Sequence, residues 1–212
     1  MGDDGVVTLE FVRTLTAVAA LFANVATVAL VVVLVAVRSS PGARRLANGI
    51  GDNALLLGGL VALAATAGSL YYSEVADFIP CRFCWFQRIA MYPAALVLLV
   101  GAFFRDRNAR RYGLPMAAIG LSLSTYHYLL QHGVFEEGSS CDPLAPCSAA
   151  YVWEFDFISI PYMAGSGFAL ILALLATSWV RRPAPDRADR ELELTDGTFT
   201  NRSETLVEEP VP

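Results

Sequence analysis

Residues 80–104 read PCRFCWFQRIAMYPAALVLLVGAFF and place two cysteines, three positions apart, just before a long apolar segment. The part from Phe83 to Phe104 has the length that a helix needs to cross a bilayer core, which takes about 20 apolar residues. Gln87 and Arg88 are polar residues near its start. An arginine inside a membrane helix costs free energy and usually marks a functional site. This stretch therefore predicts a membrane helix with reactive groups at one end.

Four further segments are of similar length and are also apolar. They are Leu15–Val37, Asn53–Tyr72, Tyr112–Leu130 and Ile158–Val180. Together with Phe83–Phe104 they predict an all-α integral membrane protein with five spans. The first segment lacks the basic start of a signal peptide and is longer than the apolar part of one, so we expect it to be retained as a helix.

The composition agrees with a membrane protein. Hydrophobic residues make up 55% of the 212 residues and charged residues 17%, against about 45–50% and 25% in soluble domains. The formal net charge of -5 leaves no basic surface for a phosphate backbone, which excludes a nucleic-acid binder. The expected surroundings are a lipid bilayer.

The arginines predict the orientation in the membrane. Twelve of them lie in the loops 38–52 and 105–111 or after residue 180, whereas only Arg13 and Arg82 fall on the other side. Cytoplasmic loops carry the excess of positive charge. We therefore expect residues 1–14 and the loops 73–82 and 131–157 outside the cytoplasm. The polar, acidic residues 181–212 are expected to form a disordered cytoplasmic tail.

All four cysteines, Cys81, Cys84, Cys141 and Cys147, lie in or beside the two outer loops. Thiols confined to an oxidising face are typical of disulfides, and two pairs can also exchange with each other. Three interpretations compete: two structural disulfides, a redox relay, and a four-cysteine zinc site, which an oxidising face disfavours. Four cysteines permit three pairings, and the sequence does not choose among them.

The residues after Cys81 favour the relay. A Cys-x-x-Cys pair at the start of a helix gains thiolate stabilisation from the free N–H groups and the helix dipole. Arg88 lies four residues after Cys84 and therefore on the same face, although it could also extend to the membrane interface. Gln87 adds an amide beside it. Polar groups at a lipid boundary fit an electron acceptor that dissolves in lipid, which means a quinone.

The stretch from Pro80 to Pro93 resembles, nearly residue for residue, the Cys-x-x-Cys-x-x-Gln-Arg-x-x-Met-Tyr-Pro signature of the DsbB family of membrane thiol:quinone oxidoreductases. Residues 126–131 resemble the end of the family's penultimate helix, and residues 146–148, 153 and 158–161 resemble the start of its last helix. The short spacing between the last two cysteines is closer to the BdbC-like branch of Gram-positive bacteria. The resemblance covers residues 53–180 and implies a four-helix membrane domain, to which residues 15–37 add an extra transmembrane helix.

The resemblance also implies a function in the prokaryotic plasma membrane. The protein would re-oxidise an exported DsbA-like thiol oxidase and pass the electrons to ubiquinone or menaquinone, with no metal. Cys141 would form the mixed disulfide with this partner, and Cys147 would then exchange with Cys81. Cys84 would be the thiolate that faces the quinone.

Three further residues would bind this quinone. Arg88 would bind or polarise it, and Gln87 and His127 would lie beside it, whereas His132 is expected to be a solvated loop residue. Two alternatives remain: a quinone reductase of the vitamin K epoxide reductase type and a non-catalytic membrane protein with two structural disulfides. The Gln-Arg-x-x-Met-Tyr-Pro run favours the DsbB family over the first of these.

Overall fold

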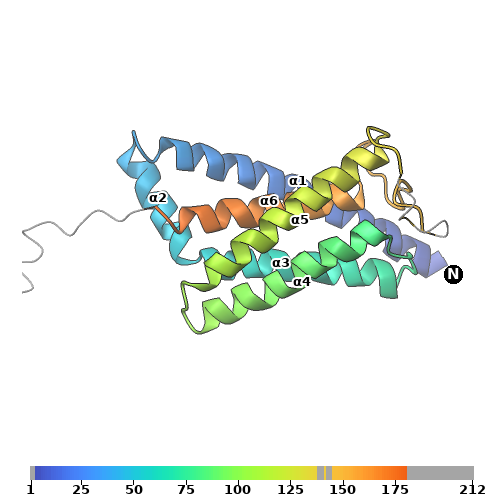
Figure 1. The fold of residues 1–212 in the computed structure, drawn as a ribbon, viewed down its shortest axis with the longest axis horizontal. Coiled ribbons are helices and arrows are strands. Elements are labelled where there is room, and N and C mark those ends of the chain that lie inside the picture. Colours follow the sequence, from blue (N-terminus) through green and yellow to red (C-terminus); the bar gives the residue numbers. More distant parts are fainter. Residues whose placement is uncertain (1–2, 138–140, 142–144, 181–212) are drawn as a thin grey trace, which may run out of the picture. The chain divides into compact units, whose positions relative to one another are not determined.

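Six helices make up most of the computed structural model, which describes residues 3–137, 141 and 145–180 (Figure 1). The predicted tail, residues 181–212, lies outside the described residues. The helices are α1 (Asp3–Ala36), α2 (Pro41–Asp52), α3 (Ala54–Glu74), α4 (Arg82–Phe103), α5 (Ala109–Gln131) and α6 (Ile160–Thr177). The described residues form no strands beyond an isolated bridge between Glu154 and Ile158.

Among the described residues, four helices are long and apolar enough to cross a membrane. They are α3, α4, α6 and the part of α1 from Thr8 to Ala36. The prediction of an all-α membrane protein with an extra N-terminal helix is therefore confirmed. That helix begins at Asp3 rather than Leu15, because the residues before the apolar segment continue the same helix.

The fifth predicted span, Tyr112–Leu130, lies within α5, which is less apolar than the other four and does not reach the apolarity of a membrane span. Its polar residues have an internal role. Ser124 and His127 are each 1% exposed, so they face the interior of the bundle rather than lipid. A helix whose polar residues point inward can lie among membrane helices while its average apolarity stays low.

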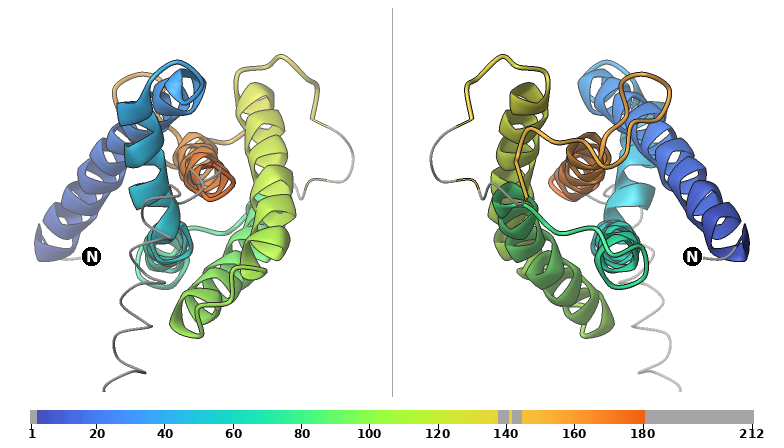
Figure 2. Two further views of the ribbon diagram at one scale, coloured as in Figure 1. Left: turned by 90° about the vertical axis from the view of Figure 1, so that its left-hand side faces the viewer. Right: turned by 90° about the vertical axis from the view of Figure 1, so that its right-hand side faces the viewer.

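Helix α6 lies at the centre of the bundle. It packs against α1, α3 and α5, and α4 completes the arrangement by packing between α3 and α5 (Figure 2). Half of the apolar segment of α6 is buried (50%), against 11% in α1. Helix α1 is therefore a peripheral helix whose exposed side carries large apolar residues such as Phe22, Val28 and Val32.

The core of the bundle forms where α4, α5 and α6 meet. Leu98, Phe168, Ile171 and Leu175 are fully buried there. Gly120 of α5 permits the close approach of α6, because a Cβ atom at this position would lie 2.2 Å from the ring of Phe168. A larger residue at 120 would force the two helices apart.

The loop predicted at residues 38–52 contains a helix, α2. Ser40 is its N-cap residue, its hydroxyl accepts a hydrogen bond from the N–H of Ala43, and Pro41 occupies the first turn. These are ordinary helix start signals. Ala43, Leu46, Ala47 and Ile50 recur at helical spacing, but the helix has only 12 residues and is too short to be recognised as a membrane span.

Both cysteine-bearing loops lie at the same end of the bundle as the start of α1 (Figure 1). Phe78 joins the two loops by stacking on Tyr72 and on Tyr151, with ring centroids 5.8 and 5.2 Å apart. The arginine-rich segments lie at the opposite end of the helices, where Arg107 pairs with Asp52 at 3.2 Å. The fold thus brings the two cysteine-bearing loops together.

Candidate active site

The pair Cys81 and Cys84 lies where α4 begins. Cys81 is the N-cap residue, and its sulfur accepts a hydrogen bond from the backbone N–H of Cys84 at 3.3 Å. The two Sγ atoms are 2.9 Å apart, and neither cysteine is in a disulfide. The contact satisfies one of the free N–H groups of the first turn and holds both sulfurs at the positive end of the helix dipole.

Cys81 is the acidic member of this pair. The hydrogen bond with Cys84 is the largest cause that lowers the pKa of the Cys81 thiol to about 4; burial opposes this, and a hydrogen bond with His127 adds to it. The hydrogen bond with Cys84 therefore favours the thiolate form of Cys81. The role of Cys84 as the thiolate that faces a quinone stays a prediction.

His127 connects the two cysteine pairs. Its Nε2 atom lies 3.6 Å from the sulfur of Cys81 and 3.0 Å from the carbonyl oxygen of Cys147. The side chain is 1% exposed, and its Nδ1 atom has no hydrogen-bond partner among the described residues. His132, the other histidine, is exposed at the end of α5, as expected.

Cys141 and Cys147 form a disulfide, with their Cα atoms 6.0 Å apart. Glu137 anchors this loop, because its carboxylate accepts hydrogen bonds from the backbone N–H of Cys147 and the hydroxyl of Ser148. These bonds, of which the one from Ser148 has the largest effect, lower the pKa of Glu137. The carboxylate is therefore ionised at neutral pH.

The two pairs form a single cluster. Cys81 and Cys147 are buried together with Leu130, and Phe83, Cys84 and Cys141 pack against them. The two cysteine-bearing loops thus meet at this cluster. A four-cysteine zinc cage would require four thiolates. In this structure Cys141 and Cys147 are bonded to each other instead.

Arg88 and Gln87 lie one turn further along α4, and both are buried, at 8% and 5% exposed. Arg88 donates from Nε to the hydroxyl of Ser69 and from Nη2 to its carbonyl oxygen, both at 2.9 Å. Gln87 donates to the hydroxyl of Ser124 at 2.9 Å. Two hydrogen bonds to α3 hold Arg88 inside the bundle, so it does not extend to the membrane interface.

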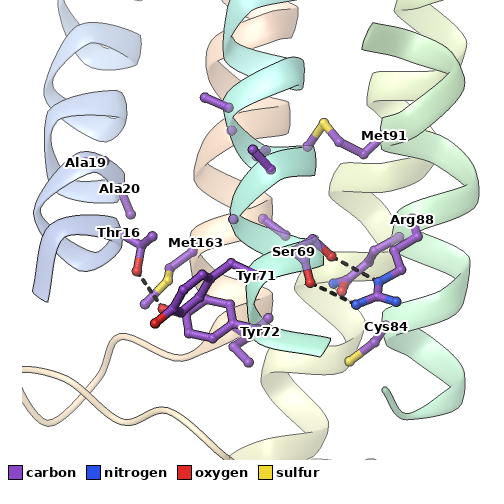
Figure 3. Close-up of a pocket in the computed structure, with 18 of the residues that line it drawn as sticks. Thr16, Ala19, Ala20, Ser69, Tyr71, Tyr72, Cys84, Arg88, Met91 and Met163 are labelled. Carbon is purple, nitrogen blue, oxygen red and sulfur yellow. Dashed lines mark hydrogen bonds between the residues drawn. The ribbon is translucent and has the colours of Figure 1, made fainter. Parts of the chain in front are cut away.

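A cavity of about 890 Å³ opens beside these residues (Figure 3). Helices α1, α3, α4 and α6 contribute its walls, which are mostly apolar. The polar groups on the α4 side are Cys84, Gln87 and Arg88. Figure 3 shows α1 on the opposite side, where the hydroxyl of Thr16 lies 2.7 Å from that of Tyr72. His127 and Cys81 are not among the residues that line the cavity.

The predicted residues thus fall into two groups. The four cysteines and His127 form the cluster between the loops, and Cys84, Gln87 and Arg88 lie on the cavity. Cys84 belongs to both groups. The role of His127 toward a quinone stays a prediction, although its contacts are with the cysteines.

Three site residues escaped the sequence analysis: Ser69, Glu137 and Thr16. Ser69 holds Arg88, and the signal that could have revealed it is a serine in an otherwise apolar span, three residues before Tyr72. Glu137 is one of many acidic residues in the chain, so the sequence gives no reason to select it. Thr16 belongs to α1, whose packing partners the sequence does not specify.

Comparison with known families places these residues in context. The family model described as "Disulfide bond formation protein DsbB" matches residues 51–178, which include α3 to α6 and all four cysteines. Helix α1 lies before the matched residues. No solved structure matches the chain.

Several bacterial proteins are similar to more than half of the chain. A "Probable disulfide formation protein" of Oceanobacillus iheyensis is 50% identical over 125 residues, which cover 58% of this chain and 86% of that protein. "Disulfide bond formation protein C" of Bacillus subtilis is 45% identical over 117 residues, 55% of this chain and 85% of its own. A "Probable disulfide formation protein" of Deinococcus radiodurans is 44% identical over 140 residues, with shares of 62% and 90%.

Proposed function

Since the chain belongs to the DsbB family of disulfide bond formation proteins, we propose that this membrane oxidoreductase passes electrons from an exported DsbA-like thiol oxidase to a quinone. One observation carries the proposal. Cys84 lines the apolar cavity, whereas Cys81, its partner in the pair, packs against Cys147. The pair therefore has one sulfur toward the loop disulfide and one toward a site open to an apolar ligand.

The cavity suits a quinone of the ubiquinone or menaquinone type. When bound, a quinone supplies an acceptor for two electrons and two protons and leaves as a quinol. The residues present fit such a group: an apolar cavity, a cysteine on its wall, and the buried guanidinium of Arg88 one turn away. Buried cations beside apolar walls orient polar ligand oxygens. Arg88 and Gln87 are the proposed binding residues.

The exchange between the pairs follows ordinary thiol–disulfide chemistry. A thiolate of the partner attacks the Cys141 sulfur, and the mixed disulfide resolves to leave Cys141 and Cys147 as thiols. The Cys147 thiolate then attacks Cys81 in the Cys81–Cys84 disulfide and releases Cys84. Attack of Cys141 on Cys147 re-forms the loop disulfide and releases Cys81 as the thiolate. The resulting state, one disulfide and two thiols, has the pairing observed here.

His127 is the proposed positioning residue of this exchange. Its Nε2 atom contacts both the Cys147 carbonyl and the Cys81 sulfur, so one side chain aligns the two reacting cysteines. A hydrogen bond to a sulfur that becomes negative also stabilises the leaving thiolate. The histidine thereby favours Cys81 as the leaving group when the loop disulfide re-forms.

Replacing His127 by alanine should raise the pKa of Cys81. The test uses a reduced variant with Cys141→Ser and Cys147→Ser, in which the ultraviolet absorbance of the thiolate is followed against pH. One thiol, that of Cys81, should ionise with a midpoint near pH 4. Adding His127→Ala should raise this midpoint by about one to two pH units, because a hydrogen bond to a charged group contributes ~1.5–3 kcal/mol. Cys81 reacts as the thiolate, which exists above the pKa. As the pH falls, the His127→Ala variant should therefore lose its thiol reactivity at a higher pH than the parent variant. His132→Ala is the control, and an equal shift in both variants would contradict the role of His127.

The arginine distribution supports an orientation in a prokaryotic plasma membrane. We propose that residues 1–14 and both cysteine loops face outward and that residues 181–212 are cytoplasmic. Loops 38–52 and 105–111 carry the arginines at the end of the helices opposite the cysteines, which agrees with this orientation. The outer loops would then meet an exported partner directly. The domain division at residues 15–37 and 53–180 is part of the same proposal.

A thiol count on purified, fully reduced protein in detergent tests the proposed function. Anaerobic addition of a quinone should remove all four thiols and form two quinols per protein. The reason is that the formation of each disulfide from two thiols releases two electrons and two protons. Four persistent thiols in a folded sample would contradict the quinone route and would return two structural disulfides as the leading account. Thiol loss without quinol formation would identify a different acceptor.

A further inference from the structure

Helix α1 forms part of the cavity although it lies before the residues that the family model matches. It lines the cavity with Thr16 at the outer end and with four alanines, Ala19, Ala20, Ala23 and Ala26, further along. These residues recur every three or four positions and therefore share one face of the helix. This face, together with Leu15 and Phe22, borders the same cavity as Cys84 and Arg88.

Polar contacts fix α1 in this position. Asn24 donates to the hydroxyls of Tyr162 and Ser166 of α6, each at 3.0 Å. Arg13 pairs with Glu154 at 2.8 Å, near the cysteine loops. Polar contacts between membrane helices specify one packing arrangement. The contacts of Asn24 and Arg13 therefore hold α1 in a defined position on the bundle. The α1 wall is therefore a built part of the domain.

Helices α1 and α3 meet only near the cysteine end of the cavity. The hydroxyls of Thr16 and Tyr72 are 2.7 Å apart, and a Cβ atom at Gly68 would be in ordinary contact with Thr16 at 3.8 Å. Beyond this point the walls of the cavity include the α1 alanines and Ala64 and Ala65 of α3, beside the larger Phe22 and Val61. These walls are apolar and therefore suit a hydrocarbon chain. We call this part of the cavity the groove.

The groove and the site at Cys84 belong to one cavity. Its volume of about 890 Å³ is near the upper end of the ~300–1,000 Å³ of small-molecule sites, more than the ring of a quinone alone requires. Cys84 and Arg88 lie at the α4 side, and Ala19 and Ala20 follow Thr16 along α1 (Figure 3). This distribution matches a ligand that has a polar ring and a long apolar tail.

We propose that α1 forms the binding wall for the hydrocarbon tail of the quinone, which packs on Ala19, Ala20 and Ala23. The inference rests on the proposed function and extends it. The family's four helices supply the ring site, and α1 adds selection for the tail. A phospholipid acyl chain has similar chemistry, and the experiment separates the two.

Ala23→Leu tests the tail site, with Ala29→Leu as the matched control. Ala29 lies on the same helix, is exposed, and does not line the cavity. Binding is measured on fully oxidised protein, which cannot turn over, by quenching of tryptophan fluorescence. The probes are a quinone with a prenyl tail of several units and the same ring without a tail. Ala23→Leu should weaken binding of the prenylated quinone about tenfold or more, because the larger side chain occupies the groove.

The tail-free quinone should bind both variants as it binds the unsubstituted protein, which also shows that Ala23→Leu is folded. Ala29→Leu should leave both Kd values unchanged, so partitioning into the micelle is not the cause. Equal weakening of both quinones, or no weakening of either, would overturn the tail assignment. Loss of co-purified phospholipid without a change in quinone binding would identify the groove as a lipid site. If the unsubstituted protein binds neither quinone, the proposed function itself fails.

Discussion

Replacement of Cys84 by serine should abolish quinone reduction, a loss of at least ~10³-fold, while the loop disulfide still exchanges with a partner thiol. The reason is the position of the sulfur. Cys84 lines the cavity, and Cys141 and Cys147 are bonded to each other on the other side of Cys81. Removing a nucleophile that acts as part of a unit removes nearly all of the catalysis of that step, typically by several powers of ten. Quinol formation under anaerobic conditions measures the loss.

The same sample supplies the complementary result. The Cys141–Cys147 disulfide of the Cys84→Ser variant should still oxidise one equivalent of a reduced dithiol peptide. Mass spectrometry of the peptide measures this oxidation. Cys147→Ser should show the reverse pattern, because the Cys81–Cys84 pair can still reduce a quinone after chemical reduction. Full quinone turnover by Cys84→Ser would remove the assigned role of this cysteine.

The fold was largely predictable because hydrophobic length dominates in a membrane protein. Apolar runs of about 20 residues identify helices almost regardless of tertiary context. The exceptions are informative. The helix α2 was missed because its 12 residues are too few for a membrane span, although Leu46, Ala47 and Ile50 recur at helical spacing. The predicted span at residues 112–130 is less apolar than a typical membrane helix, because it contains polar residues such as Ser124 and His127. These two residues face the interior of the bundle.

The candidate site was predictable in its members more than in its geometry. The motif around Cys81 and Cys84 contains the reactive residues within a few positions of each other, so sequence spacing is sufficient to find them. Contacts between helices are different, because no pattern in the chain specifies that Ser69 meets Arg88 or that Thr16 meets Tyr72. These pairs arise from packing between α1, α3 and α4. The sharing of a proton between two sulfurs also depends on a distance, 2.9 Å, that only the fold defines.

Replacement of Arg88 by alanine should raise the quinone KM by about 10- to 100-fold, with a smaller effect on exchange between the cysteine pairs. A charge-assisted hydrogen bond contributes ~1.5–3 kcal/mol, and each 1.4 kcal/mol is a factor of ten. Ser69 engages Nε and Nη2 of Arg88, which fixes the guanidinium at the cavity wall. Arg88→Lys should give an intermediate KM, because a lysine keeps the charge but cannot reproduce the forked hydrogen bonds.

Arg82→Ala is the matched control, since it removes the same charge six residues earlier at an exposed position that does not line the cavity. Its quinone KM should stay within about twofold of the unsubstituted protein, as for an exposed charge whose interactions are screened by solvent. An equal rise in both variants would mean that Arg88 acts through the general field at the start of α4. A rise in the quinone KM that is confined to the Arg88→Ala variant would mean that Arg88 contacts the quinone at short range. Both arginines belong to α4, but only Arg88 is directed into the bundle and can make that contact.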